Sequence, residues 1–226
     1  MSDWAWPVAR YILEEGLPAT LIVSGVAVVG STLIGVVLGT LLTIRFFPVR
    51  ALIRAYVEVF RGLPILVTVF VVYFGLPSIW QTLEFGALTA TAVALTLWGS
   101  AQVAEATRGA VGSIPKEQHE AAAALGFGWV GRHEFVILPQ AFRRLLPPLV
   151  SLVVNLVQNS TLAQVIGGLE ILEAAERQNE RITAIPPIGL GQVHAFGIFG
   201  FAMLLFFVIS FPLTRLAAYL ERRLVV

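Results

Sequence analysis

Cysteine is absent from the 226 residues, so the chain has no disulfide framework and no thiolate metal site. Aspartate occurs once, at Asp3, and lysine once, at Lys116. Because Lys116 follows Ile114 and Pro115, no phosphate-binding GxxxxGK[ST] loop exists. With Asp3 as the single aspartate, a magnesium aspartate of the usual NTPase kind is also excluded. The sequence therefore predicts that this chain does not hydrolyse ATP itself.

Charge is scarce as well. Charged residues make up 13% of the chain, against roughly 25% in a usual soluble domain. The net charge of +1 is too small to suggest a nucleic-acid partner. Hydrophobic residues reach 57% and are gathered into long runs, which predicts an all-α integral membrane protein.

About 20 apolar residues are needed to cross roughly 30 Å of hydrocarbon. Five such spans are predicted, at 19–44, 51–79, 85–107, 141–166 and 194–216. The second should bend near Pro64, because proline removes a helix hydrogen bond. Residues 1–18 do not have the pattern of a removable signal peptide and predict an amphipathic lead-in at the outer membrane surface. The loop 168–193 should hold a surface helix in which Glu173 and Arg177 are paired.

The distribution of basic residues predicts the orientation. Twelve of them follow the first, third and fifth spans: Arg45, Arg50, Arg54, Arg61, Arg108, Lys116, Arg132, Arg143, Arg144, Arg215, Arg222 and Arg223. Only Arg10, Arg177 and Arg181 lie on the other side. The positive-inside rule then places the N-terminus outside, and the C-terminus and residues 108–140 in the cytoplasm.

The segment "EAAAALGFGWVGRHEFVILPQ" is polar by comparison with its surroundings. Glu120 and the alanines after it favour a helix, and Gly126 and Gly128 are expected to end it with a left-handed cap. A second short helix should run over 130–138 and close at Pro139, which opens the fourth span. The simpler alternative is a solvated hairpin between two spans.

The spacing of this segment closely resembles the EAA loop of ABC importer permeases. Glu120-Ala121-Ala122 is followed by three residues, Gly126, nine residues and Val136-Ile137-Leu138-Pro139. Val136 replaces the isoleucine that is usual there. The stretches "YVEVFRGLPILV", "AEATRGAVGSIPKEQHEAAAALG" and "NSTLAQVIG" extend the similarity, over residues 17–224, to the histidine/glutamine/arginine branch of polar amino acid permeases.

The resemblance implies a type I ABC importer permease fold in the bacterial cytoplasmic (inner) membrane. It also implies a coupling helix that seats in a cytoplasmic ABC ATPase dimer, formed here by Glu120, Ala121, Ala122, Gly126, Leu138 and Pro139. Further implied partners are an extracytoplasmic amino acid-binding protein, membrane lipid and a second permease subunit, identical or paralogous. No cofactor is expected on this chain, since ATP and Mg²⁺ would be held by the ATPase.

Two polar stripes could line the path of the cargo, because polar groups in a span usually face a partner helix or a wet cavity. Their members are Trp98, Gln102 and Glu105 in the third span, and Ser151, Asn155, Gln158, Asn159 and Thr161 in the fourth. The alternative is that these groups only hold membrane helices together by hydrogen bonds. The neutral pair Gln158-Asn159 stands where relatives often carry a lysine and an acidic or amide residue, so this patch does not reveal the charge of the cargo.

Three other features of the sequence are expected to serve the structure rather than the transport of a cargo. Ala27, Ser31, Gly35 and Gly39 form a small-residue stripe that permits close helix packing, either within the subunit or against a second one. Glu58 is placed to pair with both Arg54 and Arg61, as an interfacial anchor. The three histidines, His119, His133 and His194, are dispersed and suggest no metal site.

Two rival functions belong to other classes. A secondary transporter would carry coupling carboxylates deep in its spans and usually an internal repeat. Glu105 is the single deep candidate, and no repeat is visible. A membrane anchor that recruits a soluble enzyme would need the basic loop but not the amide stripes.

Overall fold

The computed structural model describes residues 4–44, 46–80, 82–184 and 190–224, and every regular element in these ranges is helical. Four of these helices are long and apolar enough to cross a membrane: Ala5–Leu41, Ala87–Gly112, Trp129–Ile166 and His194–Leu224. A bent helix pair, Phe47–Gly62 with Ile65–Ile79, makes a fifth candidate if it counts as one crossing. Arg45 and part of the predicted loop 168–193 lie outside the described residues.

The predicted lead-in continues directly into the first span. Helix α1 (Ala5–Tyr11), a π-helical turn and helix α2 (Leu17–Leu41) form one helix of 37 residues. Such a helix is about 55 Å long, well beyond the hydrocarbon thickness of a bilayer. The apolar run located the membrane-crossing part, but it did not predict that the helix extends unbroken through the polar residues before it.

Single turns of π-helix occur at Ile12–Gly16, Val71–Gly75 and His133–Ile137. Each is followed, two residues after its end, by a proline: Pro18, Pro77 and Pro139. Within an α-helix, a proline ring clashes with the carbonyl four residues back, and here that carbonyl belongs to the middle residue of the π turn. The wider turn lets each helix continue past its proline.

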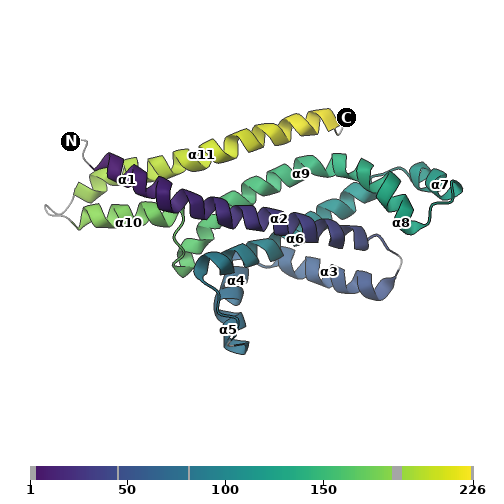
Figure 1. Cartoon of the computed structure of the whole chain (residues 1–226), viewed down its shortest axis with the longest axis horizontal. Helices are drawn as coiled ribbons and strands as arrows, with labels where there is room; N and C mark the ends of the chain where they lie inside the picture. The colour runs from purple at the N-terminus through teal and green to yellow at the C-terminus, as the bar shows by residue number, and fades with distance from the viewer. Residues whose placement is uncertain (1–3, 45, 81, 185–189, 225–226) are drawn as a thin grey trace.

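The second predicted span is broken rather than kinked. Helix α3 (Phe47–Gly62) ends at Leu63, and α4 (Ile65–Phe70) begins after Pro64, at an angle of 108° to it. Leu63 and Pro64 have ψ angles of 142° and 131°, since a residue before proline is driven out of the helical region. The position of the bend was predicted correctly, but its size was not. Helix α5 (Leu76–Ile79) completes this arm, which projects from the bundle (Figure 1).

The centre of the bundle is a close contact between α2 and α6 (Ala87–Gly112). All four members of the small-residue stripe are buried. A Cβ atom on Gly35 would stand 2.4 Å from Cβ of Val103, and one on Gly39 would stand 2.4 Å from the Ala104 carbonyl oxygen. The small-residue stripe therefore packs within the subunit, which is one of the two arrangements that the sequence allowed.

The remaining helices complete the bundle. Helix α9 (Leu138–Asn159) packs on α6 and α11, and tightens into a 3₁₀ turn at Ser160–Ile166. The loop helix α10 (Ile171–Thr183) contacts α11 (Leu190–Leu224). In Figure 1, α1 and α10 lie at one end of the long axis, and α7 (Lys116–Ala124) with α8 (Trp129–Arg132) lies at the other. The predicted outer and inner segments are thus at opposite ends of the molecule.

Glu170 is a fully buried carboxyl group between the 3₁₀ turn and α10. Its two oxygens accept hydrogen bonds from the backbone N–H groups of Leu172 and Glu173, at 2.9 Å each, so it caps α10. Burial raises the pKa of Glu170 to about 7, against the lowering effect of those two hydrogen bonds. The adjoining N–H of Ile171 donates to the hydroxyl of Thr20, which ties the cap to α2. The predicted pair of Glu173 and Arg177 is present, at 2.6 Å.

The α2–α6 contact predicts how two glycines of one helix respond to the same change. Gly39→Ala places a methyl group against backbone of α6, which should lower the free energy of unfolding by about 1–3 kcal/mol. Gly25→Ala meets nothing within 4 Å and should raise it by about 0.5–1 kcal/mol. Thermal unfolding of the purified full-length protein, followed by circular dichroism, measures both. Equal melting temperatures for the two variants would contradict the contact.

Candidate functional site

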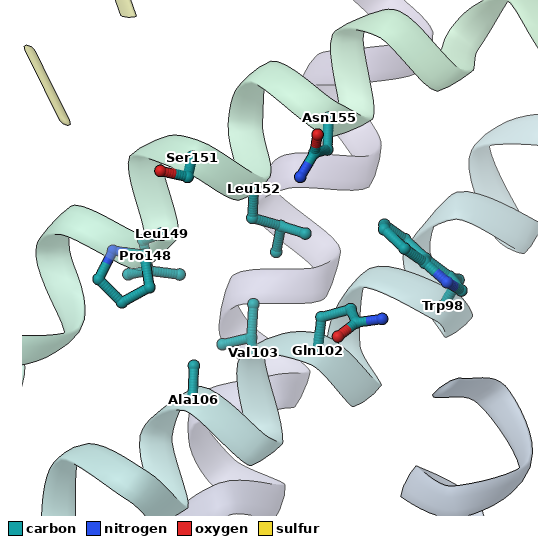
Figure 2. A pocket seen from close by; sticks show the side chains of 9 residues that line it. All are labelled: Trp98, Gln102, Val103, Ala106, Pro148, Leu149, Ser151, Leu152 and Asn155. Carbon is teal, nitrogen blue, oxygen red and sulfur yellow. The ribbon is translucent and has the colours of Figure 1, made fainter. Parts of the chain in front are cut away.

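A cavity of about 440 Å³ lies between α6 and α9. Four of the residues predicted to line a cargo path line this cavity: Trp98, Gln102, Ser151 and Asn155. Figure 2 shows Gln102 and Trp98 on α6 facing the side of α9 that carries Asn155. Helical spacing on each segment is responsible, because residues three or four apart share a face.

The rest of the lining is apolar and was not predicted from the sequence. It consists of Val103, Ala106, Pro148, Leu149 and Leu152. The polar groups stand among these small and aliphatic side chains (Figure 2). An apolar cavity with a few polar groups is the usual composition of a small-molecule site.

An arginine from the neighbouring helix fixes the orientation of Gln102. Nε of Arg61, on α3, donates to Oε1 of Gln102 over 3.3 Å. Because that bond uses the amide oxygen, the NH₂ group of Gln102 is the part left to donate to a molecule in the cavity. The prediction that Glu58 pairs with both Arg54 and Arg61 is confirmed for Arg54, at 2.8 Å. It is wrong for Arg61, which contacts Gln102 and Glu105 instead.

Glu105 is the centre of an ion-pair cluster and does not line the cavity. Its carboxylate accepts from Arg108 on the same helix, at 2.5 and 3.0 Å. From α3, Arg54 lies 3.4 Å away and Arg61 lies 4.0 Å away. Three arginines therefore converge on one carboxylate, and the cluster joins α3 to α6. One of the three, Arg61, is also the arginine that bonds to Gln102.

Three further predicted path residues lie beyond the cavity, near the C-terminal end of α9. Gln158 is exposed. The side-chain amide of Asn159 donates to the backbone oxygen of Asn155 at 2.8 Å. The hydroxyl of Thr161 donates to the backbone oxygen of Gln158, also at 2.8 Å. These bonds stay within the helix, in keeping with the alternative in which such groups serve the helix itself.

The predicted coupling segment forms a compact protrusion. Helix α7 (Lys116–Ala124) ends in Gly126, whose φ of +84° is the expected left-handed cap. Glu120 and Ala121 are exposed, while Ala122 is buried against the bundle. Beyond the cap, Leu125 and Val130 are 78% and 67% exposed. A short helix with exposed aliphatic side chains is thus presented at one end of the molecule (Figure 1).

Two details of this segment differ from the prediction. Gly128 has an ordinary φ of −66° and precedes α8, so Gly126 alone carries the left-handed cap. The second helix is not closed by Pro139. It runs from α8 through the π turn at His133–Ile137, and Leu138 and Pro139 then form the first turn of α9.

The histidines are less dispersed than the sequence suggested. The rings of His119 and His133 lie 6.2 Å apart between centroids, and His133 packs on Trp129 at 4.1 Å. Residues 119 and 133 meet because the chain turns back at Gly126. The absence of a cofactor on this chain stays a prediction.

A family comparison matches most of this chain. Residues 31–226 match the binding-protein-dependent transport system inner membrane component. This chain belongs to that family. It is accordingly a multi-pass protein of the bacterial inner membrane and an amino acid ABC transporter permease, as its EAA loop predicted.

Curated relatives of this permease cover almost its whole length. It is 35% identical over 210 residues to the probable glutamine ABC transporter permease protein GlnM of Bacillus subtilis (strain 168), covering 93% of this chain and 92% of the relative. It is 34% identical over 224 residues to the glutamine transport system permease protein GlnP of Escherichia coli (strain K12), covering 98% and 97%.

Solved structures support the fold. A crystal structure of an amino acid ABC transporter with histidines has a TM-score of 0.79 and 28% identity, covering 95% of this chain and 94% of that one. An inward-facing MetNI methionine ABC transporter has a TM-score of 0.72 at 21% identity, covering 97% and 99%, and is similar in fold. The prediction of a type I permease fold is in line with both.

The arginine cluster predicts unequal effects for two glutamates. Glu105→Gln removes the charge on which three arginines converge, and should lower the free energy of unfolding by about 1–2 kcal/mol, after allowance for the partly exposed arginines. Glu58→Gln disrupts an exposed pair within one helix and should cost about 0.5 kcal/mol or less. Chemical or thermal unfolding of the purified protein distinguishes them. A larger loss for Glu58→Gln would contradict the cluster's role in joining α3 to α6.

Proposed function

We propose that this chain forms the translocation path for a polar amino acid, and that glutamine is the first cargo to test. The observation that supports this most is the amide-lined cavity between α6 and α9. The two relatives described above, a probable glutamine permease and a glutamine permease, supply the particular cargo. The crystal structure with histidines keeps other polar amino acids as candidates.

The cavity offers chemistry suited to such a cargo. Gln102 presents its NH₂ group, a donor for a carboxylate or an amide oxygen, because Arg61 holds its oxygen. The side-chain amide of Asn155 has both a donor and an acceptor, and so does the hydroxyl of Ser151. Trp98 supplies an aromatic wall (Figure 2). Since none of the described residues that line it is charged, the cavity suits a net-neutral, zwitterionic molecule.

Transport would be powered by a separate ATPase, since this chain lacks the phosphate-binding loop. Helix α7 is the proposed contact, with Glu120 on its exposed surface and Leu125 just beyond its end. The helix that follows passes through Pro139 into α9 without a break. A displacement of α7 and the adjoining α8 would therefore be transmitted along one continuous helix to α9, which lines the cavity.

The other partners follow from the same arrangement. An extracytoplasmic binding protein would deliver the amino acid at the end of the molecule that carries α10. A second permease subunit would close the path, because one bundle of this size does not surround the cavity, which is open on one side. Alternating access, driven by ATP binding on the partner, is the proposed mechanism.

The cavity proposal is tested by uptake of labelled glutamine in vesicles that contain this permease, its ATPase and its binding protein. Gln102→Ala and Asn155→Ala should each reduce uptake about tenfold, because each removes one hydrogen bond worth about 1.4 kcal/mol. Thr89→Ala, an exposed polar position on the same helix α6, is the control and should leave uptake unchanged. Unaltered uptake by both cavity variants would remove the cavity from the path.

The coupling proposal has its own measurement, co-purification of the ATPase with the permease. Glu120→Arg should weaken the complex by reversing a surface charge, and Gly126→Val should do so by straining a left-handed cap that costs a side chain about 1–2 kcal/mol. Glu84→Arg reverses an exposed charge away from α7 and is the matched control. Retention of the ATPase, and of its cargo-stimulated hydrolysis, by both α7 variants would show that the force enters elsewhere.

A further inference from the structure

A second cavity, of about 780 Å³, lies behind the proposed coupling segment. It opens where α2 and α6 end, and α7 and α8 form its other wall. Its basic lining residues are Lys116, His119, Arg132 and His133. No described aspartate or glutamate lines it, so a concentration of positive charge surrounds an open space.

Among the described residues, the lysine and the arginine of this cavity have no acidic partner. Within the described ranges, neither Lys116 nor Arg132 takes part in an ion pair. Nε of Arg132 is buried and has no hydrogen-bond partner in that part of the chain. One of its other nitrogens, Nη1, reaches the backbone oxygen of His119 at a long 3.5 Å. A buried donor without an acceptor is costly, so contacts within the described part of the chain leave the guanidinium of Arg132 with unused hydrogen-bonding capacity.

Hydrogen bonds hold part of the wall around these cations in place. Nδ1 of His133 donates to the backbone oxygen of Trp129 over 2.8 Å. Nε2 of the same ring lies 3.2 Å from the hydroxyl of Thr43, at the end of α2. The ring is thereby held between α2 and α8, and Trp129 stacks on it. The cavity is a formed feature of the helix ends and not a gap beside flexible surface chains.

The remaining lining indicates what kind of anion fits. Ile44, Phe46, Val111 and Ile114 are apolar and lie beside the cations. Phe46 is 61% exposed, and its neighbour Phe47 is 68% exposed. Helices α2 and α6, whose ends frame the cavity, are two of the apolar spans. A ligand with a negative head and an apolar body matches this layout better than a small soluble ion.

We propose that this cavity binds the phosphate group of an anionic phospholipid. Arginine and lysine are the usual phosphate ligands of proteins, and basic pockets between helix ends at the membrane surface suit acidic lipid head groups. The lipid phosphate would accept from the guanidinium of Arg132 and from the ammonium of Lys116, which both line the cavity, while the acyl chains lie along the exposed apolar residues. This assignment does not depend on the identity of the cargo.

Tryptophan quenching tests the assignment, because Trp129 lines the cavity. The full-length permease is reconstituted in phosphatidylcholine vesicles that contain, at equal mole fraction, either phosphatidylglycerol or phosphatidylcholine brominated near the head group. The difference between the native chain and Trp129→Phe gives the quenching of Trp129 itself. We expect brominated phosphatidylglycerol to quench it several-fold more than brominated phosphatidylcholine.

The charge-neutral double variant Lys116→Gln/Arg132→Gln should lose this preference. Arg222→Gln/Arg223→Gln removes the same charge near the end of α11 and should keep it. Lys116→Gln alone changes an exposed side chain, so it retains the fold even if the double variant does not, and it should lose part of the preference. Equal quenching by the two lipids in the native chain would overturn the proposal.

Two further outcomes would assign the cavity differently. If inorganic phosphate at millimolar concentration abolishes the phosphatidylglycerol preference, the ligand is a free anion and the lipid assignment fails. If the neutral variants keep the lipid preference but no longer co-purify with the ATPase, these cations contact acidic groups of that protein instead. Loss of lipid preference with the ATPase retained is the result that we expect.

Discussion

The structure depends most on the close approach of α2 and α6. Ala27, Ser31, Gly35 and Gly39 bring the two backbones so near that a single methyl group at Gly39 would meet a carbonyl oxygen of the other helix. Without a large hydrophobic driving force between helices in lipid, such contact is what holds spans together. Since α6 also carries Trp98, Gln102 and the Glu105 cluster, this contact positions the cavity.

The helices and their polar faces could be predicted from the sequence because they depend on composition and periodicity. The apolar runs located the helices, and the stripes on 85–107 and 141–166 brought Trp98, Gln102, Ser151 and Asn155 to one cavity. The spacing around Glu120 and Gly126 identified the family. The helix ends were less predictable, because hydropathy marks the apolar part of a helix and not the polar turns that continue it.

What the sequence did not predict depends on contacts between distant segments. Arg61 is close to Glu58 along the chain, but it bonds to Gln102 across the α3–α6 boundary, and no local pattern shows this. The pairing of His119 with His133 requires the turn at Gly126. The break at Pro64 is far larger than an ordinary proline kink, because Leu63 and Pro64 are both extended and the preceding Gly62 lets α3 end.

The buried acid at the head of α10 has a practical consequence for work with the purified protein. Because burial raises the pKa of this carboxyl group to about 7, it keeps its proton to a much higher pH than an exposed glutamate does. The charge at the junction of α10 with α2 therefore depends on the pH of the buffer in the range where proteins are usually handled. Crystals, assays and spectra recorded in different buffers would compare different chemical species.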